Sequence, residues 1–121
     1  MKQRLLVMNG QRILQNHDGK TGWKTAGRIK PIEAGIKPGI YSLYLAEDAI
    51  TTNKKYDGLI LMVDKEKGNV YQKVDKKFII HKLESFKFTP TPGKNVSIQY
   101  ENNVLNLYKI DVLAKKKTHK I

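Results

Sequence analysis

Residues 40–83 read IYSLYLAEDAITTNKKYDGLILMVDKEKGNVYQKVDKKFIIHKL and hold most of the apolar clusters of the chain. Within them, residues 40–46, 59–63, 70–74 and 78–83 are short runs of β-branched, aromatic and aliphatic residues, the composition typical of strands. The first two runs are apolar at both alternating sets of positions, which predicts central strands. The segments between the last three runs are too short for the crossovers of parallel strands, so we predict an antiparallel meander.

Turn residues on both sides of this stretch predict further hairpins. Asn9-Gly10 and Asn102-Asn103 each separate two strand-like runs, and these residue types suit the positive φ angles of two-residue hairpin loops. Residues 47–58 read as a long exposed connection with a helical turn at residues 47–50. The predicted fold is all-β and mainly antiparallel, a small curved sheet or barrel of about seven to nine strands with little helix.

The length and the absence of cysteine limit the class of protein. A chain of 121 residues is typical of one domain, and we expect a single β domain over residues 1–112 followed by a basic, disordered tail over residues 113–121. Without cysteine, disulfides, thiolate metal sites and thiol nucleophiles are excluded. No run approaches the roughly 18 apolar residues of a membrane span, and no signal peptide is recognisable. We therefore expect a cytoplasmic protein without a membrane partner.

The net charge of +12 is concentrated at the two ends of the chain. Residues 1–37 hold eight basic and two acidic side chains and residues 109–121 hold five and one, whereas residues 38–108 hold ten and eight. This asymmetry predicts a polyanionic partner, nucleic acid first and an acidic protein second. Only three of the 23 basic residues are arginine, which favours phosphate contacts over base-specific readout. The alternative is a solubilising, lysine-rich surface with a mobile tail.

Basic residues interleaved with aromatic residues are the best local indication of a nucleic-acid surface. They surround Trp23, the only tryptophan, although our first expectation for its side chain is that it covers one end of the core. A second such group precedes Tyr56, where a solvated loop tip is the preferred reading, and lysines near the C-terminus can contact phosphates without sequence preference. The candidate residues for binding nucleic acid or another partner are Lys20, Trp23, Lys24, Arg28, Lys30, Lys54, Lys55, Lys115, Lys116 and Lys117.

No catalytic or metal-binding pattern emerges from the sequence. The three histidines are His17, His81 and His119, and no pair of them has a metal-ligand spacing. A nuclease with histidine acid and base is chemically possible, but nothing in the spacing supports it. His81 is expected to be a half-exposed strand residue. The prediction is a protein that is not an enzyme, with no catalytic residues, no bound metal and no cofactor.

Four segments of the chain resemble a known domain. They are GIYSLYLAEDA (39–49), YDGLILMVDKEKGNVYQ (56–72), IIHKLESF (79–86) and PGKNVSIQY (92–100). Together they resemble the KfrB-type domain, which is found in proteins of conjugative plasmids and related mobile elements, and the resemblance covers residues 27–100. It implies a bacterial protein with a role in plasmid maintenance or transfer, acting as an interaction module. It implies no catalytic residues.

These observations lead to one main functional hypothesis and two alternatives. The main hypothesis is a non-enzymatic interaction module, borne by a plasmid or mobile element, that acts in plasmid maintenance or transfer through a protein partner, nucleic acid or both. In this hypothesis the nearly neutral central sheet supplies specificity and the basic ends supply electrostatic affinity. The alternatives are a general nucleic-acid-binding protein that stacks bases on Trp23, and an inhibitor of a host defence complex. The oligomeric state stays open.

Overall fold

The computed structural model describes residues 2–8, 11–20, 22–29 and 36–109. Over these residues the chain is all-β, as predicted, with ten strands and two short 3-10 turns. Two of the strands are only three and two residues long, and they account for the excess over the predicted number. The strands are β1 (Lys2–Met8), β2 (Gln11–His17), β3 (Trp23–Ile29), β4 (Gly39–Tyr41), β5 (Glu47–Asp48), β6 (Lys54–Asp64), β7 (Asn69–Val74), β8 (Lys77–Lys82), β9 (Asn95–Glu101) and β10 (Val104–Lys109), and the turns are η1 (Leu43–Leu45) and η2 (Leu83–Ser85).

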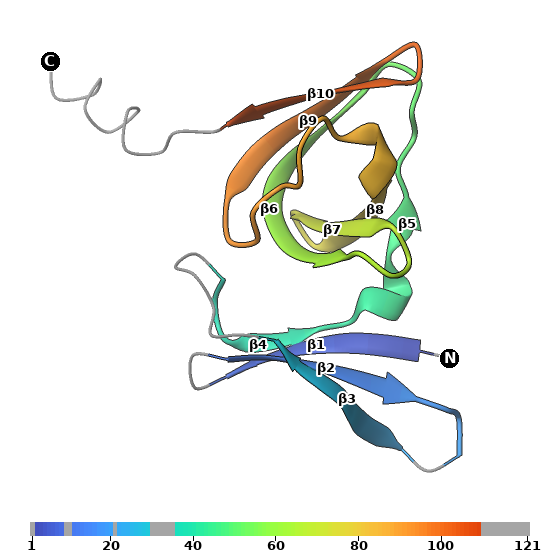
Figure 1. The fold of residues 1–121 in the computed structure, drawn as a ribbon, viewed down its shortest axis with the longest axis vertical. Coiled ribbons are helices and arrows are strands. Elements are labelled where there is room, and N and C mark those ends of the chain that lie inside the picture. Colours follow the sequence, from blue (N-terminus) through green and yellow to red (C-terminus); the bar gives the residue numbers. More distant parts are fainter. Residues whose placement is uncertain (1, 9–10, 21, 30–35, 110–121) are drawn as a thin grey trace, which may run out of the picture.

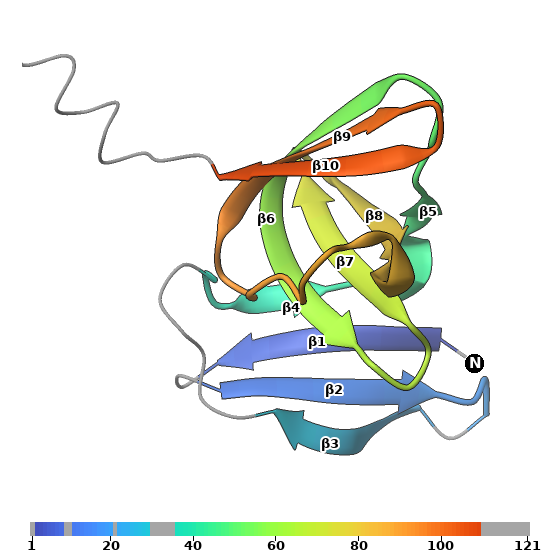
Figure 2. The ribbon, with the colours of Figure 1, turned by 45° about the horizontal axis from the view of Figure 1, so that its top comes forward.

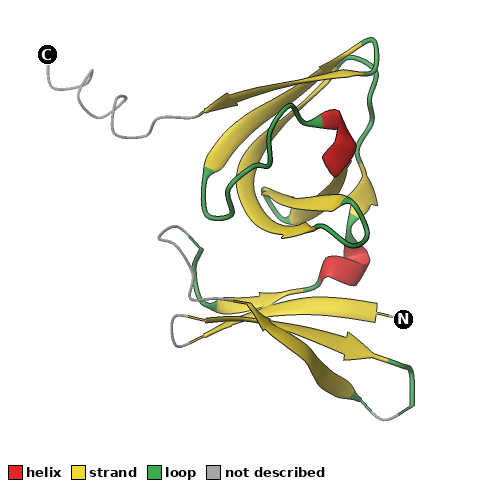
Figure 3. Ribbon diagram, in the orientation of Figure 1, coloured by secondary structure: helices red, strands yellow, loops and turns green. Residues whose placement is uncertain are grey.

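The strands form two sheets (Figure 1). One has four strands in the order β3-β2-β1-β4, and the other has six in the order β10-β9-β6-β7-β8-β5. The six-stranded sheet curls on itself above the flatter four-stranded sheet, and Figure 2 shows the same two layers from a tilted direction. All neighbouring strands are antiparallel except β5, which pairs parallel to β8. The two helical turns lie in connections between strands (Figure 3).

The meander and one outer hairpin have the predicted turns. Strands β6, β7 and β8 follow one another antiparallel, and Gly68 in the loop after β6 has a φ of 69°. Asn102 and Asn103 connect β9 to β10 with φ angles of 50° and 68°. Glycine and asparagine tolerate this left-handed region better than other residues, so they fix where these hairpins turn. Asn9-Gly10 and residues 110–121, the predicted tail among them, lie outside the described residues.

Three predictions about residues 40–58 are wrong. Residues 40–46 are not a central strand, because only β4 pairs, at an edge of the four-stranded sheet, and η1 follows directly. The chain passes from one sheet to the other here, which buries Leu43 and leaves Leu45 62% exposed. Residues 47–50 form no helical turn, since β5 lies there. Lys54 and Lys55 begin β6 instead of standing in a loop tip, because β9 pairs with them.

Strand β6 has both faces buried, as its sequence predicts. The register between β6 and β7 shifts between Ile60 and Met62, so Leu61 is an extra residue in the strand. The bulge turns two successive side chains, Leu61 and Met62, toward the four-stranded sheet, while Ile60 and Val63 point into the curled sheet. One strand therefore contributes to two separate cores.

The two cores lie on opposite sides of the six-stranded sheet. The intersheet core lies between the two sheets and consists of Leu5, Val7, Ile36, Tyr41, Leu43, Leu61, Met62 and Tyr71. The inner core fills the curl of the six-stranded sheet and consists of Tyr56, Ile60, Val70, Ile79, Val96, Ile98, Tyr100 and Leu105. Burial of apolar surface on this scale is the main force that holds a domain of this size together.

A close backbone approach occurs where β6 passes β7 at Gly58. A Cβ atom at Gly58 would lie 1.9 Å from the carbonyl oxygen of Lys73, which no real contact tolerates. Glycine therefore lets β6 bend tightly around the inner core at this point.

The substitution Gly58→Ala should destabilise the protein by about 3 kcal/mol or more, because the methyl group can be accommodated only if the backbone moves. Urea unfolding of both proteins would measure the difference. Gly68→Ala is the control: a Cβ there has nothing within 4 Å, so only the strain of positive φ, about 1 kcal/mol, is expected. Equal effects of the two substitutions would contradict a steric role for Gly58.

A buried hydrogen-bond network crosses the inner core. His81 Nε2 lies 2.8 Å from Gln72 Oε1, and His81 Nδ1 lies 2.6 Å from the hydroxyl oxygen of Tyr100. These three side chains come from β8, β7 and β9. The amide nitrogen of Gln72 donates to the carbonyl oxygens of Tyr56, Gly58 and Val96 at 3.2, 3.3 and 3.2 Å. The network thus satisfies polar groups that burial would otherwise leave unpaired.

The hydrogen-bond partners fix the neutral form of His81. Because the Gln72 amide nitrogen donates to carbonyl groups, its Oε1 faces His81 and can only accept. His81 Nε2 therefore carries the hydrogen, and Nδ1 accepts from the Tyr100 hydroxyl. Burial lowers the pKa of His81 to about 4 and raises the pKa of Tyr100 to about 12. The predicted half-exposed position of His81 is wrong, since the side chain is fully buried.

Acid should therefore destabilise the protein before its carboxylates titrate fully. Unfolded His81 takes up a proton near pH 6.5 and the folded residue only near pH 4, so stability falls as pH drops through this window. Between about pH 6.5 and pH 5 the free energy of unfolding should decrease by about 2 kcal/mol. Urea midpoints across this range would measure it, with His17→Gln as the control that keeps the decrease. A midpoint independent of pH would contradict a buried neutral His81.

Candidate nucleic-acid interface

The four-stranded sheet carries an uneven charge. Strands β1, β2 and β3 contain five basic residues and no acidic residue. Leu5 and Val7 of β1 point into the intersheet core, so alternation places Lys2 and Arg4 on the opposite side of the sheet, here called the outer face. Arg12 points inward instead: it is buried, and its Nη1 donates to the carbonyl oxygen of Leu61 at 3.3 Å.

The pairing of the three strands assembles a cation–aromatic cluster on the outer face. Lys2 pairs with His17, and His17 pairs with Trp23. The guanidinium carbon of Arg4 lies 4.1 Å from the ring centroid of Trp23, and the Trp23 and His17 rings are 5.0 Å apart. Tyr44 of η1 approaches Trp23 at 6.0 Å, and its ring lies 5.2 Å from Lys2 Nζ. These five residues, Lys2, Arg4, His17, Trp23 and Tyr44, are the cation–aromatic cluster.

Arg4 is held in place on both sides. Its guanidinium packs over Trp23, and its Nε donates to Gln15 Oε1 at 2.8 Å. Among the residues that the structure describes, no acceptor is in hydrogen-bond contact with its terminal nitrogens. The stacked group can therefore present two amino groups and a positive charge to a ligand, the combination that suits phosphate.

The sequence-predicted residues of this region are only partly brought together. Trp23 belongs to the cluster and to neither core, so the expectation that it covers one end of the core is wrong. Lys20 is exposed in the loop between β2 and β3, where its backbone nitrogen donates to Asp18 Oδ1 at 2.8 Å. Lys24 is exposed, but alternation places it on the face opposite to Trp23. Arg28 pairs with Ile13 in the strand register.

The other predicted residues do not join this surface. Lys54 and Lys55 begin β6, whose first residues lie at the far end of the molecule from β3 (Figure 1). Lys55 pairs with Asp57 at 3.4 Å, and Lys54 Nζ lies 5.9 Å from the ring centroid of Tyr56. Lys30 and Lys115, Lys116 and Lys117 lie outside the described residues.

Four members of the cluster were missed by sequence reasoning: Lys2, Arg4, His17 and Tyr44. A signal for the first three existed, because the hairpin at Asn9-Gly10 sets Lys2 opposite His17 once the turn is taken as a two-residue loop. Tyr44 could not be placed this way, since the sequence predicts a strand over residues 40–46 where the structure has η1. It reaches Trp23 only because the chain turns at η1.

Both histidines in the described part of the chain are hydrogen-bonded within the fold. His81 is enclosed in the inner core, and His17 Nδ1 accepts a hydrogen bond from the backbone nitrogen of Gly19 at 2.8 Å. No group of three or more histidine, cysteine or acidic side chains that could hold a metal ion occurs among the described residues. Among the same residues, no helix is long and apolar enough to cross a membrane.

Comparison with known proteins identifies part of the chain. Residues 55–109 match the KfrB domain, a match that starts later and ends later than the resemblance read from the sequence. A search of curated proteins gave no match. The matched residues run from the second residue of β6 to the end of β10, whereas the four-stranded sheet with its cation–aromatic cluster precedes them. Most of the six-stranded sheet is thus a KfrB domain, a plasmid-associated domain, over residues 55–109 of this chain.

Proposed function

We propose that the protein is a non-enzymatic interaction module of plasmid maintenance or transfer, and that it binds nucleic acid through the outer face of the four-stranded sheet. The observation that carries this proposal is the cation–aromatic cluster, in which Arg4 of β1 stacks on Trp23 of β3 and the strands β1, β2 and β3 contain no acidic residue. Nucleic acid offers both groups that such a cluster suits, because phosphates attract the cations and bases stack on the rings.

The composition of the cluster favours binding with little sequence preference. Tyr44 is 41% exposed and stands beside Trp23, so two aromatic rings can be reached from one side of the sheet. Stacking of this kind tolerates any base, since every base has a π-face. An acidic protein would satisfy the cations, but it would gain less from the rings. Nucleic acid is therefore the better fit to this surface.

Loss of a cluster side chain should weaken binding of a single-stranded DNA of about 12 thymidines by about tenfold. This is the effect of removing one stacking or charged contact worth about 1–3 kcal/mol. Trp23→Leu and Arg4→Gln would be measured by anisotropy of labelled DNA, with thermal unfolding to show that both variants fold. Lys54→Gln is the matched control, since it removes a charge at the far end of the molecule. An equal loss in the control would contradict a surface confined to the four-stranded sheet.

The salt dependence should separate nucleic acid from other partners. The logarithm of the binding constant should fall linearly with the logarithm of salt concentration, and Arg4→Gln should reduce the slope by about 0.7, the contribution of one contact to a single strand. Fluorescence of Trp23 during titration at roughly 50 and 200 mM salt would report both affinity and contact. Binding that is insensitive to salt, or absent, would contradict the proposal.

A further inference from the structure

Strand β10 ends the six-stranded sheet and pairs on one side only. Glu101 and Val104 flank the two-residue loop and pair directly, so Val104, Asn106 and Tyr108 form the hydrogen bonds to β9. The backbone N–H and C=O groups of Leu105 and Leu107 then point to the opposite side. Among the residues that the structure describes, no strand pairs with this side of β10. It is an open edge with backbone groups ready to pair.

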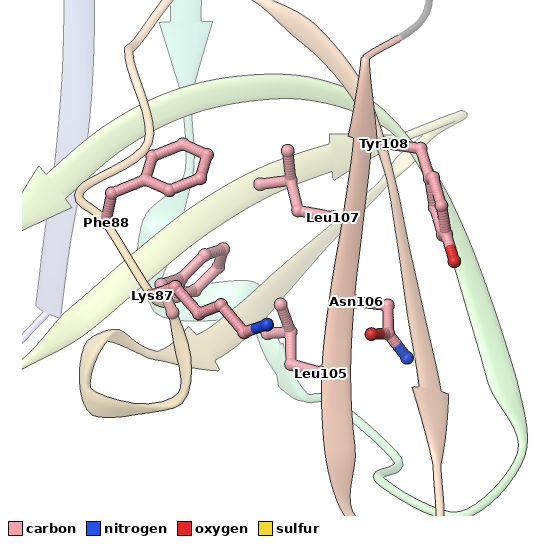
Figure 4. A pocket seen from close by; sticks show the side chains of 7 residues that line it. Lys87, Phe88, Leu105, Asn106, Leu107 and Tyr108 are labelled. Carbon is pink, nitrogen blue, oxygen red and sulfur yellow. The ribbon is translucent and has the colours of Figure 1, made fainter.

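A cavity opens beside this edge (Figure 4). Its volume is about 140 Å³, similar to the roughly 150 Å³ of a cavity that takes up one benzene molecule. Figure 4 shows Leu107 pointing from β10 toward Phe88, and the Lys87 side chain reaching toward Leu105. Polar and apolar surface line the cavity in about equal parts; the large apolar side chains are Phe86, Phe88, Leu105 and Leu107, and the one charged lining residue is Lys87.

Large apolar side chains remain exposed on both faces of the edge. Phe88 is 61% exposed on the side of the cavity. On the other side of β10, Val104 and Tyr108 are 58% and 53% exposed, and Figure 4 shows Tyr108 pointing away from Leu107. Exposed apolar side chains on both faces of an unpaired strand are unusual, because such edges attract other chains. An added strand would cover residues on both faces at once, since its own side chains alternate.

We propose that the open edge of β10, with the cavity at Phe88, binds an extended acidic segment of another protein, which adds to the six-stranded sheet as a further strand. Backbone hydrogen bonds to Leu105 and Leu107 align the bound segment along β10. One apolar side chain of the segment fills the cavity, and acidic side chains face Lys87. This mode of recognition combines main-chain hydrogen bonds with a pocket for alternate side chains.

Charge decides between this partner and a second copy of the chain. Every copy carries a net charge of +12, and residues 109–121, which continue from β10 in the sequence, carry five lysines and one acidic residue. Pairing β10 with β10 of another copy would bring two chains of net charge +12 together and is opposed by their repulsion. An acidic segment is instead attracted, and Lys87 lies at the cavity to receive it.

The test uses the full chain and an acetylated peptide of about ten residues, long enough to span the edge of β10. One face of the peptide carries a central valine flanked by glutamates, and the other face carries threonines, so the valine and the glutamates meet the cavity and Lys87 on the same side. Binding is followed by anisotropy of the labelled peptide and by amide hydrogen exchange. The same peptide with N-methyl groups on one edge keeps its side chains but cannot pair along that edge. Phe88→Ala and Lys87→Glu change the site. Their matched controls are Ile40→Ala in β4 and Lys20→Glu in the loop between β2 and β3, both distant from β10 in the sheet order.

Strand addition predicts a specific set of results. Phe88→Ala should weaken peptide binding about fivefold and Lys87→Glu about threefold or more at low salt, with no change in the controls. Exchange of the Leu105 and Leu107 amides should slow on binding, while Val104, Asn106 and Tyr108 amides keep their protection. Absence of binding, equal binding of the N-methylated peptide, or equal losses in the controls would overturn the proposal. So would a dimer in sedimentation that Phe88→Ala dissociates, because the occupant would then be a second copy.

Discussion

Strand β6 has no solvent-facing side along its buried half, and the rest of the structure depends on this constraint. Its bulge at Leu61 directs two successive side chains into the intersheet core, while Ile60 on one side and Val63 on the other remain in the inner core. In a regular strand successive side chains point to opposite faces, so Leu61 and Met62 could not both point into the intersheet core. The bulge therefore joins a curled sheet and a flatter sheet into two layers that share one central strand.

Features that depend on neighbouring residues could be predicted from the sequence. The turn at Gly68 and the loop at Asn102 and Asn103 follow from residue types that accept positive φ, and the apolar character of both faces of β6 follows from Leu59 through Val63. The short strand-like segments between these turns are enough to predict that the fold belongs to the all-β class.

Features that depend on distant contacts could not be predicted. Burial of His81 requires Gln72 and Tyr100, which come from two other strands, and nothing near His81 in the sequence signals them. The segment after Tyr41 has strand-like composition, yet it turns into η1 because it must cross between sheets. Arg4 and Trp23 are 19 positions apart and meet only through the register of three strands.

The position of Arg4 has a consequence for the thermodynamics of any ligand that reaches it. A long, flexible side chain on a surface normally loses conformational entropy when it binds, a cost of up to about 2 kcal/mol. Packed on Trp23 and bonded to Gln15, Arg4 loses much of this freedom when the chain folds. This conformational entropy is lost when the protein folds and not when the ligand binds. The attraction between the guanidinium and an anion is therefore offset by a smaller entropic cost, and the ligand binds more tightly.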